Sequence, residues 1–401
     1  MATLGTGSSP SAVASMTDPL TLIDVDHVRF FVGNAKQSAH FYAYAFGFQV
    51  DQISDLTTGN RESAQYLLTQ GNIRLILETP LSAAHPAASE MKLHGDGIKD
   101  IAFTVFDAER AWECAIKNGG HCAYEPRTTR DAGGTVTMAG IQTYGRVVHS
   151  FVSRTGSYDL PKIKQGSILA PGFRKVEGYG LNAFNLKHPC GLKFVDHCVG
   201  NVELGKMNEW VKWYEDVMGF KMFKHFDDKD IGTDFSALMS KVMASGNQLI
   251  KMPINEPAEG KRKSQIQEYL DWHNLTPGIQ HLALRTDDEL TSVAELRNRG
   301  VDFLEIPEAY YETVWKRVNA MLTSHGHSAV KEDHERVRDL GILVDSDDEG
   351  YLLQLFTKPL QDRPTLFFEI ICRRGSQSFG KGNFKALFEA LEDEQGRRGN
   401  L

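Results

Sequence analysis

One short structural unit occurs four times along the chain, and this repeat limits the folds that the chain can adopt. Each copy begins with an apolar, strand-like run, continues into an amphipathic helix that stops at glycine, and leads into further alternating strands. The four apolar runs lie at residues 25–32, 97–103, 195–200 and 278–284. Each half of the chain therefore contains two strand–helix–strands units, and we expect an α+β protein built from two similar halves.

Composition and turn residues set the expected boundaries. The first half spans residues 21–156, a connector containing several glycines and prolines spans 157–190, and the second half spans 191–401. Apolar positions at helical spacing from Phe384 onward predict a helix that closes the chain. Residues 1–20 are rich in Ser, Thr, Gly and Ala and contain no Lys or Arg, so we expect a disordered tail and not a secretory signal.

Three titratable residues of the second half sit inside apolar, strand-like runs. They are His197, His281 and Glu369. Such side chains cost free energy inside a strand unless they have a partner, and one divalent metal ion can serve all three. Two neutral imidazoles and one carboxylate on one face of the ion leave its other positions open, as in non-haem Fe(II) oxygenases. We therefore predict a metal site at these three residues.

The repeat supplies an internal control for this prediction. When the halves are aligned, Asp100 stands at the place of the second histidine and Ser150 at the place of the glutamate. His27 falls near the first histidine, although an alignment anchored on the helix ends offsets it by two residues. We expect the first half to hold no metal and His27 to be a structural histidine.

The overall composition disfavours several classes of partner. The chain has 401 residues, with 44 Lys and Arg against 52 Asp and Glu, and a formal net charge of −8. No basic stripe stands out, so we expect no nucleic-acid partner, and no apolar stretch is long enough to span a bilayer. Five irregularly spaced cysteines without a CxxC pair fit a reducing compartment, and we expect a cytoplasmic protein.

Several long motifs occur together and in order in the second half. They are Val195-Asp-His-Cys-Val-Gly-Asn201, Pro253-Ile-Asn-Glu-Pro257 with Lys263-Ser-Gln-Ile266, Gly278-Ile-Gln-His281, Gly350-Tyr-Leu-Leu-Gln-Leu-Phe-Thr-Lys-Pro359, Phe367-Phe-Glu-Ile-Ile371 and Phe379-Gly-Lys-Gly-Asn-Phe-Lys-Ala-Leu-Phe388. With these motifs the chain resembles the 4-hydroxyphenylpyruvate dioxygenase family of the vicinal-oxygen-chelate superfamily, from about Val25 to Leu401.

This resemblance implies a fold, a cofactor and a reaction. The fold is a pair of tandem βαβββ domains forming two open barrels, the second of which holds Fe(II) and ends in a C-terminal helix. The implied ligands are His197, His281 and Glu369, the residues already selected by their burial cost. The implied substrates are an aromatic 2-oxo acid and O2, and the products are homogentisate and CO2, in tyrosine and phenylalanine breakdown. Relatives suggest a homodimer or homotetramer.

The resemblance also implies a substrate pocket. Its residues in this sequence are Ser236, Asn255, Gln265, Gln280, Gln354, Phe356, Phe367, Asn383, Phe384 and Phe388. Ser236, Asn255 and Gln265 are candidates for hydrogen bonds to the phenol end of the substrate. Phe384 and Phe388 lie one helical turn apart, and we expect the C-terminal helix to close the pocket as a gate. The same apolar stripe is also compatible with ordinary core packing.

Strand alternation sorts the remaining pocket candidates. Gln354 and Phe356 share one face of their strand, and Phe367 shares the face of the metal-binding glutamate. Gln280 falls on the face opposite its histidine neighbour, so its direct role is the weakest of the set. A long polar stretch at residues 312–338 is expected to be a surface insertion that does not touch the motifs.

Two other functions remain open. A hydroxymandelate synthase resembles the family and uses the same substrate and metal, but hydroxylates the benzylic carbon. We favour ring chemistry because Phe356 and Gly382-Asn-Phe384 look like the dioxygenase. A non-catalytic binding protein of the same fold would lack an intact triad, so iron content and O2 uptake would separate it from an enzyme.

Overall fold

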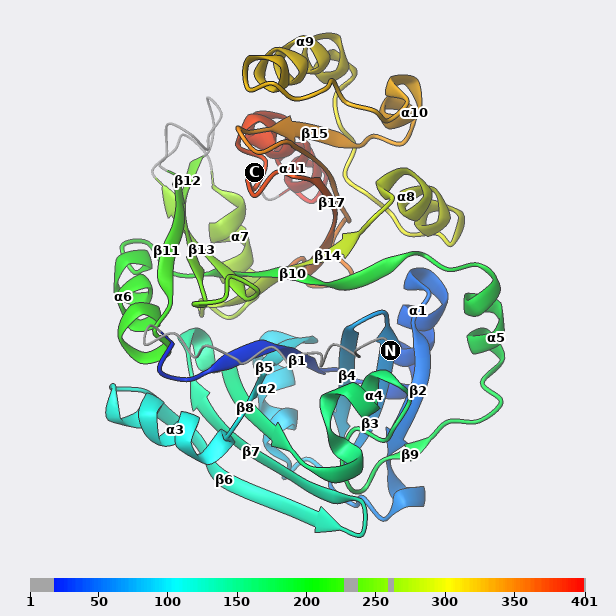
Figure 1. Cartoon of the computed structure of the whole chain (residues 1–401), viewed down its shortest axis with the longest axis vertical. Helices are drawn as coiled ribbons and strands as arrows, with labels where there is room; N and C mark the ends of the chain where they lie inside the picture. The colour runs from blue at the N-terminus through cyan, green and yellow to red at the C-terminus, as the bar shows by residue number, and fades with distance from the viewer. Residues whose placement is uncertain (1–17, 227–236, 259–262, 400–401) are drawn as a thin grey trace, which may run out of the picture.

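The computed structural model describes residues 18–226, 237–258 and 263–399, which form an α+β fold with two sheets. One sheet has nine strands from the first half and the connector, and the other has eight strands from the second half. Figure 1 shows the second half above the first, with β10 between them. The predicted fold class, two curled sheets from tandem modules followed by a C-terminal helix, is confirmed.

The first sheet has the strand order β6-β7-β8-β5-β1-β4-β3-β2-β9. Its strands are β1 (Leu22–Phe31), β2 (Gln49–Ser54), β3 (Ser63–Gln70), β4 (Ile73–Pro80), β5 (Gly97–Val105), β6 (His121–Asp131), β7 (Gly134–Gln142), β8 (Val148–Arg154) and β9 (Arg174–Lys175). The helices of this part are α1 (Ala35–Phe46), α2 (Pro86–His94), α3 (Ala108–Lys117), α4 (Leu160–Lys164) and α5 (Gly180–Lys187), with short 3-10 turns at Leu56–Thr58, Tyr144–Arg146 and Gly156–Tyr158. Because β9 pairs with β2, the connector adds a strand to this sheet.

The second sheet has the strand order β11-β12-β13-β10-β14-β17-β16-β15. Its strands are β10 (Leu192–Asn201), β11 (Lys221–Phe226), β12 (Ala237–Ala244), β13 (Lys251–Ala258), β14 (Gly278–Thr286), β15 (Leu343–Ser346), β16 (Tyr351–Phe356) and β17 (Phe367–Arg374). The helices of this part are α6 (Met207–Met218), α7 (Gln265–Trp272), α8 (Glu289–Asn298), α9 (Glu308–Ser324), α10 (His334–Asp339) and α11 (Phe384–Arg397), with a 3-10 turn at Lys381–Asn383.

The two sheets repeat the same strand pairing. β1 pairs antiparallel with β5 and parallel with β4, and β10 pairs in the same way with β14 and β13. His27 lies opposite Ala102 in the first sheet, and His197 lies opposite Ala283 in the second. His27 is therefore the direct counterpart of His197. The two-residue offset arises in the connection between the strand and its helix, which is longer in the second half.

One hydrophobic core joins the two halves. Tyr42 and Phe46 of α1 pack on Phe368 of β17, with ring centroids 5.8 and 5.1 Å apart. Arg299, just after α8, donates hydrogen bonds of 2.8 Å to the Tyr44 carbonyl and to the Asn185 side chain. The second sheet is therefore supported by the first half through apolar packing and polar contacts.

The described chain begins inside the predicted tail. Residues 1–17 lie outside the described part, but the Asp18 carboxylate accepts hydrogen bonds from the backbone of Leu20 and Leu22. Leu20 is 1% exposed and belongs to the core, so residues 18–20 are part of the fold and not of the expected tail. In the described part of the chain, no helix has both the length and the apolar character needed to cross a membrane.

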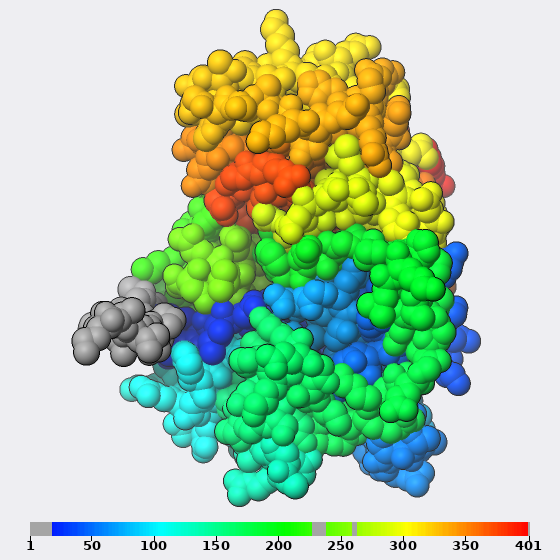
Figure 2. All heavy atoms as spheres, turned by 45° about the vertical axis from the view of Figure 1, so that its right-hand side comes forward, coloured from blue at the N-terminus to red at the C-terminus, as the bar shows by residue number. Residues whose placement is uncertain are grey.

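The stretch at residues 312–338 differs from the expectation. It contributes most of α9 and most of α10, which form the outer end of the second half in Figure 2. The prediction that it does not touch the motifs is wrong, because Arg317 contacts Asn383 at 3.4 Å and also bonds Asp345. Val314 and Val318 of α9 are buried. The outer face of α9 is polar, whereas its inner face is apolar and packs on the sheet.

Candidate metal centre and substrate pocket

Three neighbouring strands bring the predicted ligands together. His197 on β10, Ala283 on β14 and Glu369 on β17 lie side by side in the strand register, and His281 lies two residues along β14 on the same face. The potential ligand atoms of His197, His281 and Glu369 lie within 4.8 Å of one another, and all three residues are buried. The structure thus places the three predicted residues as one cluster.

The cluster has the donor set of a divalent metal site. Glu369 Oε2 lies 3.0 Å from His197 Nε2 and 3.5 Å from His281 Nε2. Burial alone would raise the pKa of Glu369, but His197 and His281 lower it to about 2, so the residue is a carboxylate. Burial lowers the pKa of His281, which favours the neutral imidazole that a metal needs. Burial would also lower the pKa of His197, but Glu369 and Asp196 raise it, so a metal ion would displace a proton there. These residues fit one ion with open coordination positions.

Neighbouring side chains orient both imidazoles. The Asp196 carboxylate lies 2.9 Å from His197 Nδ1, and the Gln280 carbonyl oxygen lies 3.1 Å from His281 Nδ1. Each contact leaves the Nε2 atom of the ring directed at the cluster, as is usual for metal-binding histidines. Burial opposes the charge of Asp196, but the guanidinium of Arg373 and His197 hold its pKa well below the usual range.

Beside the cluster lies a cavity with a mainly apolar lining. Seven predicted pocket residues line it together with the three candidate ligands: Asn255, Gln265, Gln280, Phe356, Phe367, Phe384 and Phe388. Phe367 stacks on the His281 ring at 4.7 Å with an interplanar angle of 21°, and Phe356 lies 6.2 Å from Phe367. This aromatic wall is suited to an aromatic ring bound beside the metal.

Gln280 lies on the cavity side, contrary to the strand-parity prediction. In the pairing of β10 with β14, Val199 lies opposite His281 and Gly200 lies opposite Ile279, so Gln280 is an extra residue in a β-bulge. A bulge interrupts the alternation of side chains, which is why parity failed at this position. The Gln280 amide also lies 3.5 Å from Gln265 and so connects two polar residues of the pocket.

Three predicted residues are not part of the described lining. Ser236 lies outside the described residues. Gln354 is 1% exposed and lies against Gly380, where a Cβ atom would come within 2.3 Å of its amide nitrogen. Asn383 is fully buried, and its side-chain oxygen accepts a 2.7 Å hydrogen bond from Tyr310. Gln354 therefore packs against the turn before α11, and the Asn383 contact joins that turn to Tyr310 of α9.

Sequence reasoning missed nine residues of the lining. They are Val199, Phe226, Leu238, Ser240, Val242, Pro253, Phe379, Leu387 and Leu391. Alternation along β12 connects Leu238, Ser240 and Val242, and that pattern was visible in the sequence. Phe379, whose ring lies 5.0 Å from that of His197, is the first residue of the motif at residues 379–388. Most of the missed residues are apolar and carry no chemical signal of their own.

The corresponding place in the first half holds a different set of groups. The Ser150 hydroxyl and backbone both donate to the Asp100 carboxylate, and Tyr124 bonds Ser150. Arg29 forms an ion pair with Glu78 in the same region. Among the described residues, the cluster in the second half is the one group of three potential metal ligands. Hydrogen-bonded side chains therefore occupy the place in the first half that corresponds to the metal cluster.

The fold and the cluster define a class of protein. Paired curled sheets with a two-histidine, one-carboxylate cluster beside an apolar cavity are consistent with the Glyoxalase/Bleomycin resistance protein/Dioxygenase superfamily, whose profile matches residues 24–143 and 195–355. A solved mutant of 4-hydroxymandelate synthase from Streptomyces coelicolor has a similar fold, with a TM-score of 0.77 and 26% identity over 94% of this chain and 99% of that chain.

Sequence similarity narrows the class. The chain is 46% identical to the 4-hydroxyphenylpyruvate dioxygenase of Yarrowia lipolytica over 380 residues, covering 94% of this chain and 93% of the relative. It is 45% identical to that of Dictyostelium discoideum over 379 residues, covering 94% and 99%. The chain belongs to the 4-hydroxyphenylpyruvate dioxygenase family.

Proposed function

We propose that the chain converts 4-hydroxyphenylpyruvate and O2 to homogentisate and CO2, as an Fe(II)-dependent enzyme of tyrosine and phenylalanine breakdown. The observation that carries this proposal is the buried His197–His281–Glu369 cluster beside an aromatic-lined cavity. Family membership supplies the substrate, because the relatives described above are named for it. When bound, the ferrous ion would supply the redox chemistry that activates O2 and the 2-oxo acid.

The protein residues bind the ion and the substrate and limit access of water. His197, His281 and Glu369 would hold the metal, and their single-sided placement leaves positions for the 2-oxo acid and O2. The phenyl ring would lie against Phe356 and Phe367, where ring contacts stabilise binding by about 0.5–1.5 kcal/mol beyond burial.

Polar residues of the cavity lining would select the phenol hydroxyl. Asn255, Gln265 and Gln280 line the cavity, and Ser240 of β12 lies opposite Asn255 in the strand register. A pocket built to bond a hydroxyl rejects analogues without one, because its own polar groups are then left unpaired. Ser236 remains a predicted member of this group.

The C-terminal helix would act as the gate. Phe384, Leu387, Phe388 and Leu391 of α11 all line the cavity. A helix that contributes this much of the lining can exclude water while the substrate reacts. Removing residues 376–401 should leave the metal cluster intact and increase CO2 release relative to homogentisate. Unchanged coupling after this truncation would contradict the gate.

Catalysis is assigned to residues 191–401, and residues 21–156 would form a metal-free supporting domain joined by 157–190. We further propose a cytoplasmic homodimer or homotetramer. Phe41 and Tyr44 on α1 and Phe184 and Leu186 on the neighbouring α5 are large apolar side chains that are 40–74% exposed, which supports an interface there. Light scattering after size-exclusion chromatography would give the stoichiometry.

Product identification tests the reaction. Purified protein, Fe(II), O2 and 4-hydroxyphenylpyruvate should give homogentisate and CO2 in equal amounts, measured by NMR and mass spectrometry. The variant E369A should lose metal binding and turnover, and the matched variant S150A in the first half should retain both. 4-Hydroxymandelate as the product would instead establish benzylic hydroxylation, and absence of iron binding and O2 uptake would identify a non-catalytic binding protein.

A further inference from the structure

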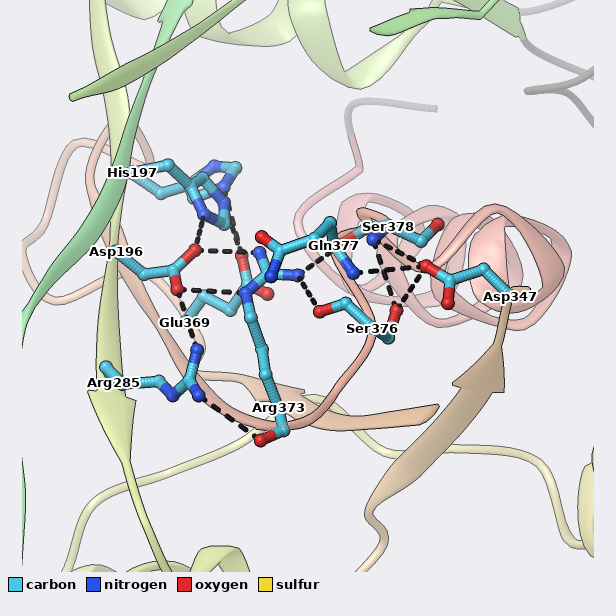
Figure 3. Close-up of polar contacts among 10 residues, drawn as sticks. Asp196, His197, Arg285, Asp347, Glu369, Arg373, Ser376, Gln377 and Ser378 are labelled. Atoms are coloured by element: carbon cyan, nitrogen blue, oxygen red, sulfur yellow. Dashed lines mark hydrogen bonds and ion pairs between the residues drawn. The ribbon is translucent and has the colours of Figure 1, made fainter. Parts of the chain in front are cut away.

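A chain of buried polar contacts leads away from the metal ligand His197. Its Nδ1 atom lies 2.9 Å from Asp196 Oδ1. Arg373 donates from Nε to Asp196 Oδ2 at 2.9 Å and from Nη2 to Oδ1 at 2.7 Å. Figure 3 shows Asp196 between His197 and the guanidinium of Arg373. The two-pronged contact fixes the plane of the carboxylate that orients the imidazole.

The remaining edge of the guanidinium holds the segment 376–378, which leads toward α11. Arg373 Nη1 donates to the backbone carbonyls of Ser376 and Ser378. From the other side, Asp347 Oδ2 accepts hydrogen bonds from the Ser376 hydroxyl at 2.6 Å and from the backbone of Gln377 and Ser378 at 3.1 and 2.9 Å. We call these two side chains the Arg373–Asp347 clamp (Figure 3).

The residue after the clamped segment lies in the pocket. The Phe379 ring lies 5.0 Å from the His197 ring at an interplanar angle of 67°, and the Arg373 guanidinium lies 5.4 Å from the Phe379 centroid. Phe379 lines the cavity together with the residues of α11. Arg373 therefore contacts both Asp196, which orients the metal ligand His197, and Phe379, whose ring lies beside His197 in the cavity.

We propose that Arg373 and Asp347 are positioning residues that hold segment 376–379 against His197 and thereby fix the start of the gate over the metal centre. Neither residue lines the cavity, so both act through the segment that they hold. This inference rests on the proposed function for its catalytic consequence, but not for its structural one. A released segment would let Phe379 move away from His197 and let water reach the reacting site.

The first half contains the same buried pair without the connection to a gate. Arg154 forms an ion pair with Asp26, and Asp26 lies 2.7 Å from His27 Nδ1. Here the guanidinium also donates from Nε to the Leu169 carbonyl, in the connector. The Asp–Arg pair alone is therefore a property of the repeated fold. Arg154 is the matched control for Arg373, because its side chain is 4% exposed against 3% and it also bonds an aspartate beside a histidine, but it has no neighbouring metal cluster.

The test compares R373K, D347N and the control R154K. Lysine keeps the charge beside the aspartate but has one ammonium group, which cannot bond Asp196 and two carbonyls in the same geometry. D347N weakens the hold on the segment from its more exposed side and leaves the Arg373–Asp196 pair intact. Deuterium exchange of the metal-free proteins, read by mass spectrometry on peptides covering 376–397, measures the release directly.

R373K and D347N should each exchange about tenfold faster over 376–397, because charge-assisted hydrogen bonds to that segment are lost. R154K should match the wild type there. With Fe(II), substrate and ascorbate as reductant, both clamp variants should form 4-hydroxyphenylacetate, CO2 and water in addition to homogentisate, so CO2 exceeds homogentisate. R154K should keep the ratio at one even if its melting temperature falls.

Unchanged exchange over 376–397 in either clamp variant would overturn the proposal, and so would equal acceleration in R154K. If R373K fails to fold, D347N decides alone through the same two measurements. If the wild type forms no homogentisate, the proposed function fails, while the exchange experiment still decides whether the clamp holds the segment.

Discussion

The buried carboxyl of Glu289 gives a quantitative prediction about stability. Glu289 is the first residue of α8, is 1% exposed, and has no hydrogen-bond partner for either oxygen among the described residues. Burial raises its pKa well above the usual value, and Glu369 and Asp288 raise it further, while Arg285 opposes the shift. In the first half the same position, after the corresponding aspartate cap, is Ala108. We therefore expect Glu289 to destabilise the fold.

The variant E289M removes the carboxyl and keeps the length of the side chain. A buried polar group without a partner costs about 1–3 kcal/mol, so E289M should gain about that much in the free energy of unfolding at pH 7.5. E289Q removes the charge but keeps a polar end, and should gain less. Urea unfolding of the metal-free proteins, followed by tryptophan fluorescence, measures both.

The raised pKa of Glu289 also predicts how the stability difference between wild type and E289M changes with pH. Because the folded pKa is raised, the native state binds the proton more tightly than the unfolded state, and wild-type stability falls as pH rises above the unfolded pKa of glutamate. The advantage of E289M should therefore shrink between pH 7.5 and pH 4.5. E335M, at an exposed first-turn position of α10, is the control and should show no such change. A loss of stability in E289M, or an equal gain at both pH values, would refute the reasoning.

Three further changes test other parts of the structure. F367A should weaken substrate binding about tenfold with iron binding retained, because it removes one of the two rings against which the substrate phenyl would lie; an unchanged KM would contradict the aromatic wall. R299A should lower the free energy of unfolding by about 2–3 kcal/mol by leaving the acceptors at Tyr44 and Asn185 unpaired; an unchanged urea midpoint would show that this contact does not join the halves. G380A should lower activity and stability, since a Cβ at this left-handed position (φ 77°) meets the Gln354 amide at 2.3 Å; wild-type behaviour in both assays would mean that the turn before α11 adjusts freely.

The metal cluster was predictable from sequence because burying unpaired titratable side chains costs free energy. A histidine or glutamate inside an apolar strand needs a partner, and the repeat showed that the first half lacks the same set. The structure adds the geometric reason, which is that His197, Ala283 and Glu369 are neighbours in the register of three strands. The α+β class and the two halves followed from the same repeat.

The pocket was less predictable because its residues depend on local irregularities. Gln280 faces the cavity through a bulge, and a bulge cannot be read from the alternation that it interrupts. The inner face of α9 reaches Asn383 through Arg317, a long-range contact that a polar sequence stretch does not reveal. The Arg373–Asp347 clamp was missed for the same reason: its members contact Asp196 and segment 376–378 only in the folded chain.

The central claim is that one ferrous ion binds at the His197–His281–Glu369 cluster, and anomalous diffraction tests it most directly. Crystals grown with Fe(II) without oxygen, measured on both sides of the iron absorption edge, should show one anomalous peak per chain, bonded to these three side chains. A strongest peak at any other residues, or a second peak beside Asp100 and Ser150 in the first half, would contradict the claim.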